Sequence, residues 1–213
     1  MRLRFSRALR AVPMPAEFLE WQVKLRRWTM LHRHGAPHAG VAPLVCVRQP
    51  GTALGVSIHS VICGLLPRSD RLEATTREFR AVYERAAHDG ASAIYDAGIA
   101  HLVQYYDSVA GFDPCSITSL LPATLPLVDA LRHNPACALL FYVFDLDERS
   151  EEGRYRCLQL DCRAELHERG PVFENVWWHN ALFHGKLDGH VVLRFLHQAS
   201  WDTRFGVFER LDG

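Results

Sequence analysis

The stretch SITSLLPATLPLVDALRHNPACALLFYVF, residues 116–144, decides the fold expected for this chain. Leu125, Val128 and Leu131 share one face of a short helix, because residues three apart lie on the same side of a helix. The Asn-Pro pair that follows ends this helix, since the residue before a proline is pushed out of the helical region. The apolar run after that pair has the length of a buried strand. The stretch therefore predicts a strand end, a polar turn, a short helix and a second strand.

Hydroxyl side chains gather around the expected start of this helix. They are Ser116, Thr118, Ser119 and Thr124. Hydroxyls and free backbone N–H groups at a helix start are well suited to bind an anion such as phosphate. The same side chains also act as ordinary caps and turn residues. A phosphate site and simple capping are both open interpretations of this turn.

The composition is typical of a soluble globular protein. Of the 213 residues, 48% are hydrophobic, and 24 basic residues balance 24 acidic ones. This balance argues against a nucleic-acid partner held by broad electrostatic attraction. No apolar run approaches the roughly 20 residues of a membrane helix, so no membrane partner is expected. The six cysteines form no C-x-x-C pair and the first residues lack a secretion signal, which predicts a reduced, cytoplasmic protein.

Apolar patterns along the chain predict antiparallel strands that are interrupted by helices. Helices are expected at the N-terminus, in an insert and in the middle of the chain, at residues 15–27, 70–88, 92–106 and 125–133. Strands are expected at residues 28–32, 38–47, 53–65, 136–144, 155–166, 172–183, 191–198 and 205–211. The whole chain, residues 1–213, is interpreted as one α+β domain with an antiparallel sheet and a helical insert at about residues 69–112.

Histidine is abundant, with 12 residues in the chain. His32, His34 and His38 crowd the first expected hairpin, and His179 and His184 lie close together later in the sequence. Imidazole is a common metal ligand and a general acid or base near neutral pH. The spacings match no firm zinc pattern. His179 is our choice for a catalytic acid or base if one exists, and a histidine-ligated metal or haem site is one alternative function.

Adjacent tryptophans form the most unusual local feature. On the strand expected here, Trp177 and Trp178 would point to opposite faces of the sheet. One would fill the core, and the other could cover an aromatic ligand ring or form a subunit contact. No P-loop, G-x-G-x-x-G, H-E-x-x-H or G-x-S-x-G motif occurs in the chain. These absences argue against nucleotide triphosphatases, Rossmann dehydrogenases, zincins and α/β-hydrolases.

Three segments resemble the FMN-binding split-barrel group, the pyridoxamine-phosphate-oxidase-like flavoproteins. TMLHRHGAPHAGVAPLV, residues 29–45, is similar to the opening hairpin of that family. SLLPATLPLVDALRHNPACALLFYV, residues 119–143, is similar to its phosphate-contacting turn, short helix and next strand. RYRCLQLDCRAEL, residues 154–166, resembles the strand that follows. Together these segments cover about half of the chain.

The resemblance implies a six-stranded antiparallel split barrel, a homodimer with FMN at the subunit interface, and an oxidoreductase that acts on a small-molecule substrate. Carried over to this sequence, Ser119 and Thr124 would contact the phosphate, and Gln159 and Arg163 would face the flavin ring. The full set of cofactor-binding candidates is Thr118, Ser119, Thr124, Arg132, Gln159, Arg163 and Trp178.

Two departures from the family pattern matter for function. The phosphate turn lacks the usual lysine or arginine and contains Ala123-Thr124-Leu125-Pro126 instead. The helical insert separates the opening hairpin from that turn, and ordinary members of the family have no such insert. A protein that kept the barrel, lost the cofactor and acts as a binding or scaffold protein is therefore the other alternative.

Overall fold

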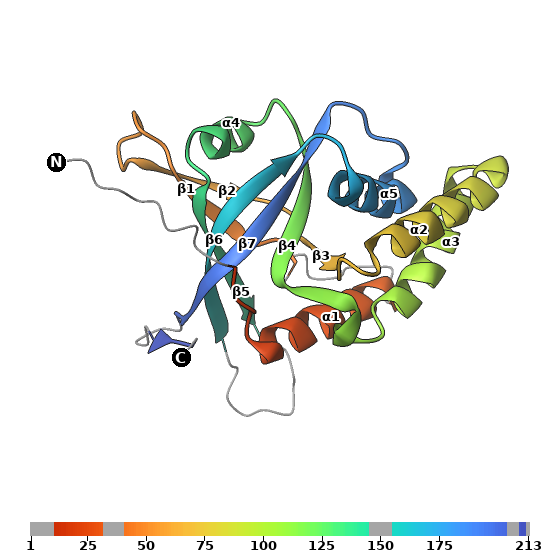
Figure 1. Ribbon diagram of the computed structural model, residues 1–213, viewed down its shortest axis with the longest axis horizontal. Coiled ribbons are helices and arrows are strands. Elements are labelled where there is room, and N and C mark those ends of the chain that lie inside the picture. The colour runs from red at the N-terminus through yellow and green to blue at the C-terminus, as the bar shows by residue number, and fades with distance from the viewer. Residues whose placement is uncertain (1–10, 32–40, 145–154, 204–208, 212–213) are drawn as a thin grey trace.

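The computed structural model describes residues 11–31, 41–144, 155–203 and 209–211 (Figure 1). These residues form one antiparallel sheet of eight strands together with five α-helices. The α+β class expected from the sequence is therefore confirmed. The expected histidine-rich turn near residue 34 and the charged loop at residues 146–153 lie outside the described residues.

The strands of the sheet are linked mainly by hairpins and helices. Their bounds are β1 Leu44–Arg48, β2 Val56–Ser60, β3 Gly64–Pro67, β4 Phe112–Pro122, β5 Ala136–Phe144, β6 Tyr155–His167, β7 His190–Asp202 and β8 Glu209–Arg210. The order across the sheet is β2-β1-β5-β6-β7-β4-β3, and β8 pairs with β7. Only residues 61–63 join β2 to β3, so the two ends of this order are held close together. The sheet must curl to allow this, and no ladder between described residues pairs β2 with β3.

The curled sheet has one buried face and one exposed face. On the buried face, Val45, Leu139, Phe141 and Leu160 are at most 1% exposed, and the residues beside them along each strand are more accessible to solvent. Helix α1, Ala16–Leu31, packs on this buried face, where the ring of Phe18 lies 4.9 Å from that of Phe141. Burial of such apolar side chains is the main force that stabilises the sheet.

The predicted helical insert is present between β3 and β4. It consists of α2, Leu72–Ala86, and α3, Ala91–Tyr105, with Gly90 at φ 93° in the turn between them. Figure 1 shows α2, α3 and α5, Pro171–His184, gathered at one end of the molecule. Helix α4, Pro126–His133, lies at the other end beside β1 and β2. The helices thus form three groups: α1 on the buried face of the sheet, an insert layer of α2, α3 and α5, and the short helix α4 beside the first hairpin.

Helix α4 and the strand after it form as predicted, with one shift in the buried face of the helix. Val128 and Leu131 are buried, but Leu125 is 36% exposed and precedes the helix. Leu127 takes its place in the core. Pro126 stands in the first turn, where its missing N–H costs nothing.

Three strand predictions are wrong. Residues 28–31 continue helix α1, where the Thr29 hydroxyl donates to Leu25 O at 2.8 Å. Residues 53–65 are divided between β2 and β3. Residues 172–183 form helix α5, because Pro171 opens a helix and Gly185 at φ 72° closes it, and packing against α2 outweighs the preference of aromatic residues for strands.

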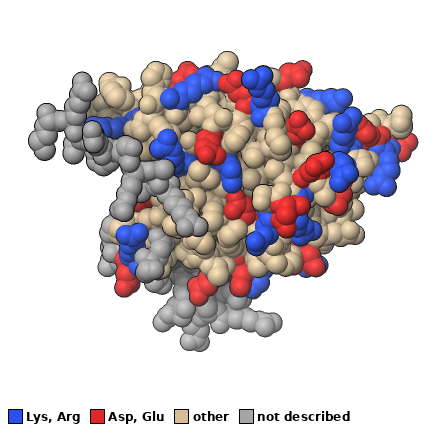
Figure 2. Space-filling view, viewed as in Figure 1, with Lys and Arg blue, Asp and Glu red and all other residues tan. Residues whose placement is uncertain are grey.

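The distribution of charged side chains on the viewed surface agrees with the equal numbers of basic and acidic residues in the sequence. Figure 2 shows basic and acidic side chains interspersed over the viewed face, without an extended field of one sign. Among the described helices, none combines the length and the apolar character that crossing a bilayer requires.

Candidate functional site

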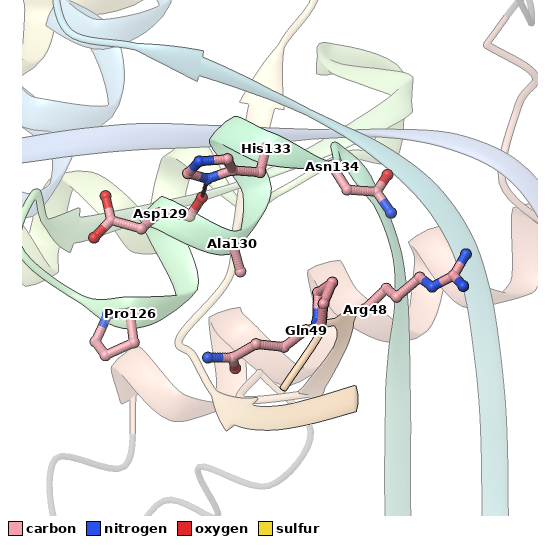
Figure 3. A pocket seen from close by; sticks show the side chains of 8 residues that line it. Arg48, Gln49, Pro126, Asp129, Ala130, His133 and Asn134 are labelled. Carbon is pink, nitrogen blue, oxygen red and sulfur yellow. Dashed lines mark hydrogen bonds between the residues drawn. The ribbon is translucent and has the colours of Figure 1, made fainter. Parts of the chain in front are cut away.

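A pocket of about 450 Å³ opens between α4 and the turn that follows β1 (Figure 3). The helix contributes one continuous face to it, because residues three and four apart lie on the same side. The lining residues are Arg48, Gln49, Pro50, Pro126, Asp129, Ala130, His133 and Asn134. The pocket thus lies beside the turn that the sequence singles out as a phosphate site.

The charged groups of this pocket are placed at different ends. In Figure 3, the Arg48 guanidinium and the Asn134 amide lie toward one end, and the Asp129 carboxylate lies toward the other. Asp129 is neutralised by Arg132 at 3.1 Å. Within the described part of the chain, Arg48 has no recorded hydrogen bond or ion pair. One end of the pocket therefore offers an unpaired cation beside an amide, a combination suited to an anionic group.

The predicted hydroxyl cluster does not surround the helix start, and this part of the prediction is wrong. Ser116, Thr118 and Ser119 lie inside β4, which continues to Pro122, and each is at most 2% exposed. Their hydroxyls are bound within the protein. Ser119 donates to Ile62 O at 2.7 Å, and Ser116 donates to Asp113 Oδ2 at 2.6 Å. The Thr118 hydroxyl lies 3.5 Å from Gly64 O.

Thr124 and Arg132 lie on the surface near the pocket but outside its lining. Thr124 is exposed in the turn before α4. Arg132 points to carboxylates on both sides, at 3.1 Å from Asp129 and 3.0 Å from Glu168. The latter pair joins α4 to the end of β6. Both pairs are largely solvated, so each contributes little to stability.

The residues expected near the flavin ring fall in two separate places. Gln159 and Arg163 share the outer face of β6, where Gln159 Nε2 donates to Asp161 Oδ1 at 2.8 Å. Trp178 lies on α5, with its ring 5.6 Å from that of Tyr83 on α2. The guanidinium of Arg80 lies over the same indole at 5.6 Å. Trp178 thus belongs to the insert layer rather than to the outer face of β6.

His179 is half-buried and belongs to a network that includes a buried arginine missed by the sequence analysis. Arg26 on α1 is only 3% exposed, and its Nη2 donates to Cys63 O at 2.5 Å. Its other guanidinium nitrogen donates to the side chain and carbonyl of Gln22. A hydrogen bond of 3.0 Å joins the Tyr106 hydroxyl to His179 Nε2. In the sequence, Arg26 is one arginine among many, so no local signal could have marked its burial.

The electrostatics of this network keep its members in one protonation state near neutral pH. Burial, followed by the charge of Arg26, lowers the pKa of His179 to about 3. Burial raises the pKa of Tyr106 to about 12. Both groups are therefore neutral near pH 7. These surroundings suit a structural hydrogen bond better than proton transfer at neutral pH.

The histidine-ligated alternative can be examined for part of the chain. Within residues 11–31, 41–144, 155–203 and 209–211, no three His, Cys, Asp or Glu side chains are grouped so that they could hold a metal ion. His32, His34 and His38 lie outside these ranges.

Comparisons with known proteins give structural similarity only. No protein-family model matches the chain, and no curated protein sequence does. Among solved structures, the chain is similar to a putative pyridoxamine 5'-phosphate oxidase from Listeria innocua, with 12% identity, a TM-score of 0.44, and coverage of 92% of this chain and 99% of that one. A conserved hypothetical protein from Mycobacterium tuberculosis gives 12% identity, a TM-score of 0.45, and coverage of 97% and 96%. A heme binding protein from Mycobacterium smegmatis gives 11% identity, a TM-score of 0.47, and coverage of 93% of this chain but 59% of that one. Similarity of this degree does not establish membership of a family.

Proposed function

We propose that this protein is a split-barrel flavoprotein that binds the phosphate of FMN at the Arg48 end of the pocket beside α4. The main support is the guanidinium of Arg48, which pairs with no described residue and supplies the cation that the phosphate turn lacks. Asn134 adds an amide donor at the same end, and a volume of about 450 Å³ is within the range of cofactor pockets. Thr124 is the sequence candidate that stays accessible beside this site. Bound flavin would supply the redox chemistry of an oxidoreductase, and the protein would supply anchoring and orientation.

The face of the first hairpin that points away from the core adjoins this pocket. Its exposed apolar side chains support the proposal that the protein is a homodimer. Arg48 pairs with Val56 across the first hairpin, and Cys46 pairs with Ile58 on the same face. Val56 is 42% exposed and Ile58 is 59% exposed. Exposed apolar surface of this kind is typical of a protein interface. A second copy on this face would cover the side of the pocket that is formed by β1.

The first test is a titration of the purified protein with FMN, followed by quenching of flavin fluorescence. We expect wild-type protein to bind FMN and Arg48→Gln to weaken binding by at least about tenfold, because a charged hydrogen bond to phosphate is lost. Arg132→Gln is the matched control and is expected to change binding by less than about twofold, since its ion pairs are exposed. Wild-type protein that does not quench flavin fluorescence, and so does not bind FMN, would overturn the flavoprotein proposal. Equal binding by wild type and Arg48→Gln would place the phosphate elsewhere.

A cofactor-free binding or scaffold protein on the same sheet is the second candidate. It is favoured by the internal hydrogen bonds of Ser116 and Ser119, which leave no phosphate-binding hydroxyls in β4. This candidate predicts a colourless protein that keeps its oligomeric state but does not quench the fluorescence of added FMN. The absorbance spectrum of freshly purified protein separates the two candidates.

The homodimer is tested by placing a charge on the outer face. Ile58→Glu is expected to convert a dimer to a monomer in analytical ultracentrifugation, because a buried unpaired carboxylate at an interface costs several kcal/mol. Tyr95→Glu is the control, since Tyr95 is 37% exposed on α3 in the insert layer. A wild-type monomer at micromolar concentration, or an Ile58→Glu dimer, would remove this face as the dimer interface.

A further inference from the structure

A second pocket, of about 340 Å³, is lined by the first half of α2, the second half of α3 and the segment that leads from α3 into β4. Its walls carry mostly polar side chains, and its lining comprises Arg71, Thr75, Glu78, His101, Gln104, Tyr105, Asp107, Ser108, Gly111 and Phe112. The rings of Tyr105 and Phe112 meet edge to face at 5.0 Å and give the pocket an aromatic side. It shares no residue with the pocket beside α4.

The Arg71 side chain is exposed, and its guanidinium lies against Gly111 at the edge of this pocket. A Cβ added to Gly111 would lie 2.7 Å from Arg71 Nη1, so the guanidinium uses the room left by the missing side chain. The backbone of the same loop is anchored by Arg68 N, which donates to Gly111 O at 3.0 Å. Among described residues, no hydrogen bond or ion pair of the Arg71 side chain is recorded. The pocket therefore contains a cation that has no counterion among the described residues.

An acidic group lines the same pocket two helical turns away. Glu78 follows Arg71 on one side of α2, with their Cα atoms about 10 Å apart at 1.5 Å per residue. It too has no recorded ion pair within the described part of the chain. Asp107, the other carboxylate of the lining, is engaged by Arg27 at 2.7 Å. The two charges of opposite sign in the pocket are thus left for a ligand rather than for each other.

His101 lines the same pocket and carries a side-chain nitrogen without a hydrogen-bond partner among the described residues. Its Nε2 is inaccessible to solvent and has no hydrogen-bond partner among described residues, which is a costly state for a ring nitrogen. Burial lowers the pKa of His101, so the imidazole is neutral near pH 7 and adds no further charge.

We propose that this pocket binds a small amino acid zwitterion, with its carboxylate on Arg71 and its ammonium on Glu78. A simple carboxylate would leave Glu78 unmatched, and a simple amine would leave Arg71 unmatched. A ligand that carries both charges on a short chain pairs with both residues and lays its methylene groups on Tyr105 and Phe112. The chemical class is therefore a compound with a carboxylate and an ammonium separated by a few carbon atoms.

Three probes of equal chain length test this directly by isothermal titration calorimetry on the full chain. They are 5-aminopentanoate, pentanoate and pentylamine. We expect 5-aminopentanoate to bind at least about fivefold more tightly than either singly charged probe, since it makes one more charged contact than each of them. In Arg71→Gln, the advantage over pentylamine should vanish. In Glu78→Gln, the advantage over pentanoate should vanish.

Two control variants on α2 separate the pocket from the general charge of the helix. Arg77→Gln and Glu73→Gln remove one charge each outside the pocket lining and are expected to leave all three affinities unchanged. The proposal is overturned if no probe binds, if the singly charged probes bind as tightly as 5-aminopentanoate, or if Arg71→Gln keeps the wild-type preference. Circular dichroism of each variant shows that the insert is folded, so a loss of binding reports the pocket itself.

Discussion

Acidification from pH 6.5 toward pH 4 is expected to reduce the free energy of unfolding by on the order of 3 kcal/mol through His179 alone. The folded state lowers the pKa of this imidazole from 6.5 to about 3, chiefly by burial and then by the charge of Arg26. A group whose folded pKa is lowered prefers to stay neutral in the fold, whereas the unfolded chain takes up a proton below pH 6.5. The stabilisation is therefore present above pH 6.5 and is lost as the pH falls toward 3.

The neighbours of His179 act in the same direction. Positive charge on Arg26, His101 and His184 opposes its protonation, and the pKa of His101 is itself lowered by burial. The ring of Phe79 lies 5.4 Å from that of His179 and 5.6 Å from that of His101, so both imidazoles are packed on one core residue of the insert. Acid thus brings positive charge into the packed interior of α2, α3 and α5.

Urea unfolding of His179→Gln at several pH values between 7.5 and 4.5 checks this prediction. Glutamine keeps a polar group near Tyr106 but does not titrate, so the variant should be less stable at pH 7.5 and should lose less stability on acidification. His88→Gln is the control, because His88 is exposed after α2. If His179→Gln keeps the full pH dependence of the wild type, His179 is not the group responsible.

Gly98→Ala is expected to destabilise the protein by about 2 kcal/mol or more, although alanine favours a helix by about 1 kcal/mol over glycine. Gly98 is buried in the middle of α3, where a Cβ would lie 2.8 Å from Leu182 Cβ and 3.1 Å from Leu182 O. Leu182 on α5 is itself fully buried and cannot move aside without displacing the helix. Close packing of α3 on α5 therefore outweighs the gain in helix propensity.

Thermal unfolding followed by circular dichroism measures this effect. A cost of about 2 kcal/mol corresponds to a fall of roughly 5 °C in the melting temperature of a chain of this size. Ala100→Gly, at an exposed position of the same helix, is the control and should cost only about 1 kcal/mol. A more stable Gly98→Ala variant would show that α3 and α5 are not in close contact at this point.

Local patterns in the sequence were sufficient for several elements. The helix at residues 126–133 and the strand after it follow from apolar spacing and from the Asn-Pro stop, which act within a few residues of chain. The two insert helices are separated at the Asp-Gly break, since only the glycine takes a positive φ there. Periodicity and backbone restrictions are properties of the segment itself, and they are the same before and after folding.

The candidate sites could not be predicted in the same way, because they depend on what lies across the fold. In the sequence, Ser119 has an ordinary side-chain hydroxyl. In the fold, this hydroxyl donates a hydrogen bond to Ile62 O at 2.7 Å and is therefore already engaged within the protein. Arg48 becomes a candidate cation only because the first hairpin places it opposite α4. Trp178 was assigned to a strand from its aromatic neighbours, yet its segment became helical through contacts with α2.

Local sequence patterns were enough to predict the α+β class, the N-terminal helix, the insert and the helix-stop-strand unit near the middle of the chain, since these depend on interactions between near neighbours. Tertiary structure decided which polar groups are buried, which are paired and which line a pocket. Hydrogen bonding, burial and pKa are set by residues distant in sequence, such as Arg26 and His179, and only the folded chain brings those residues together.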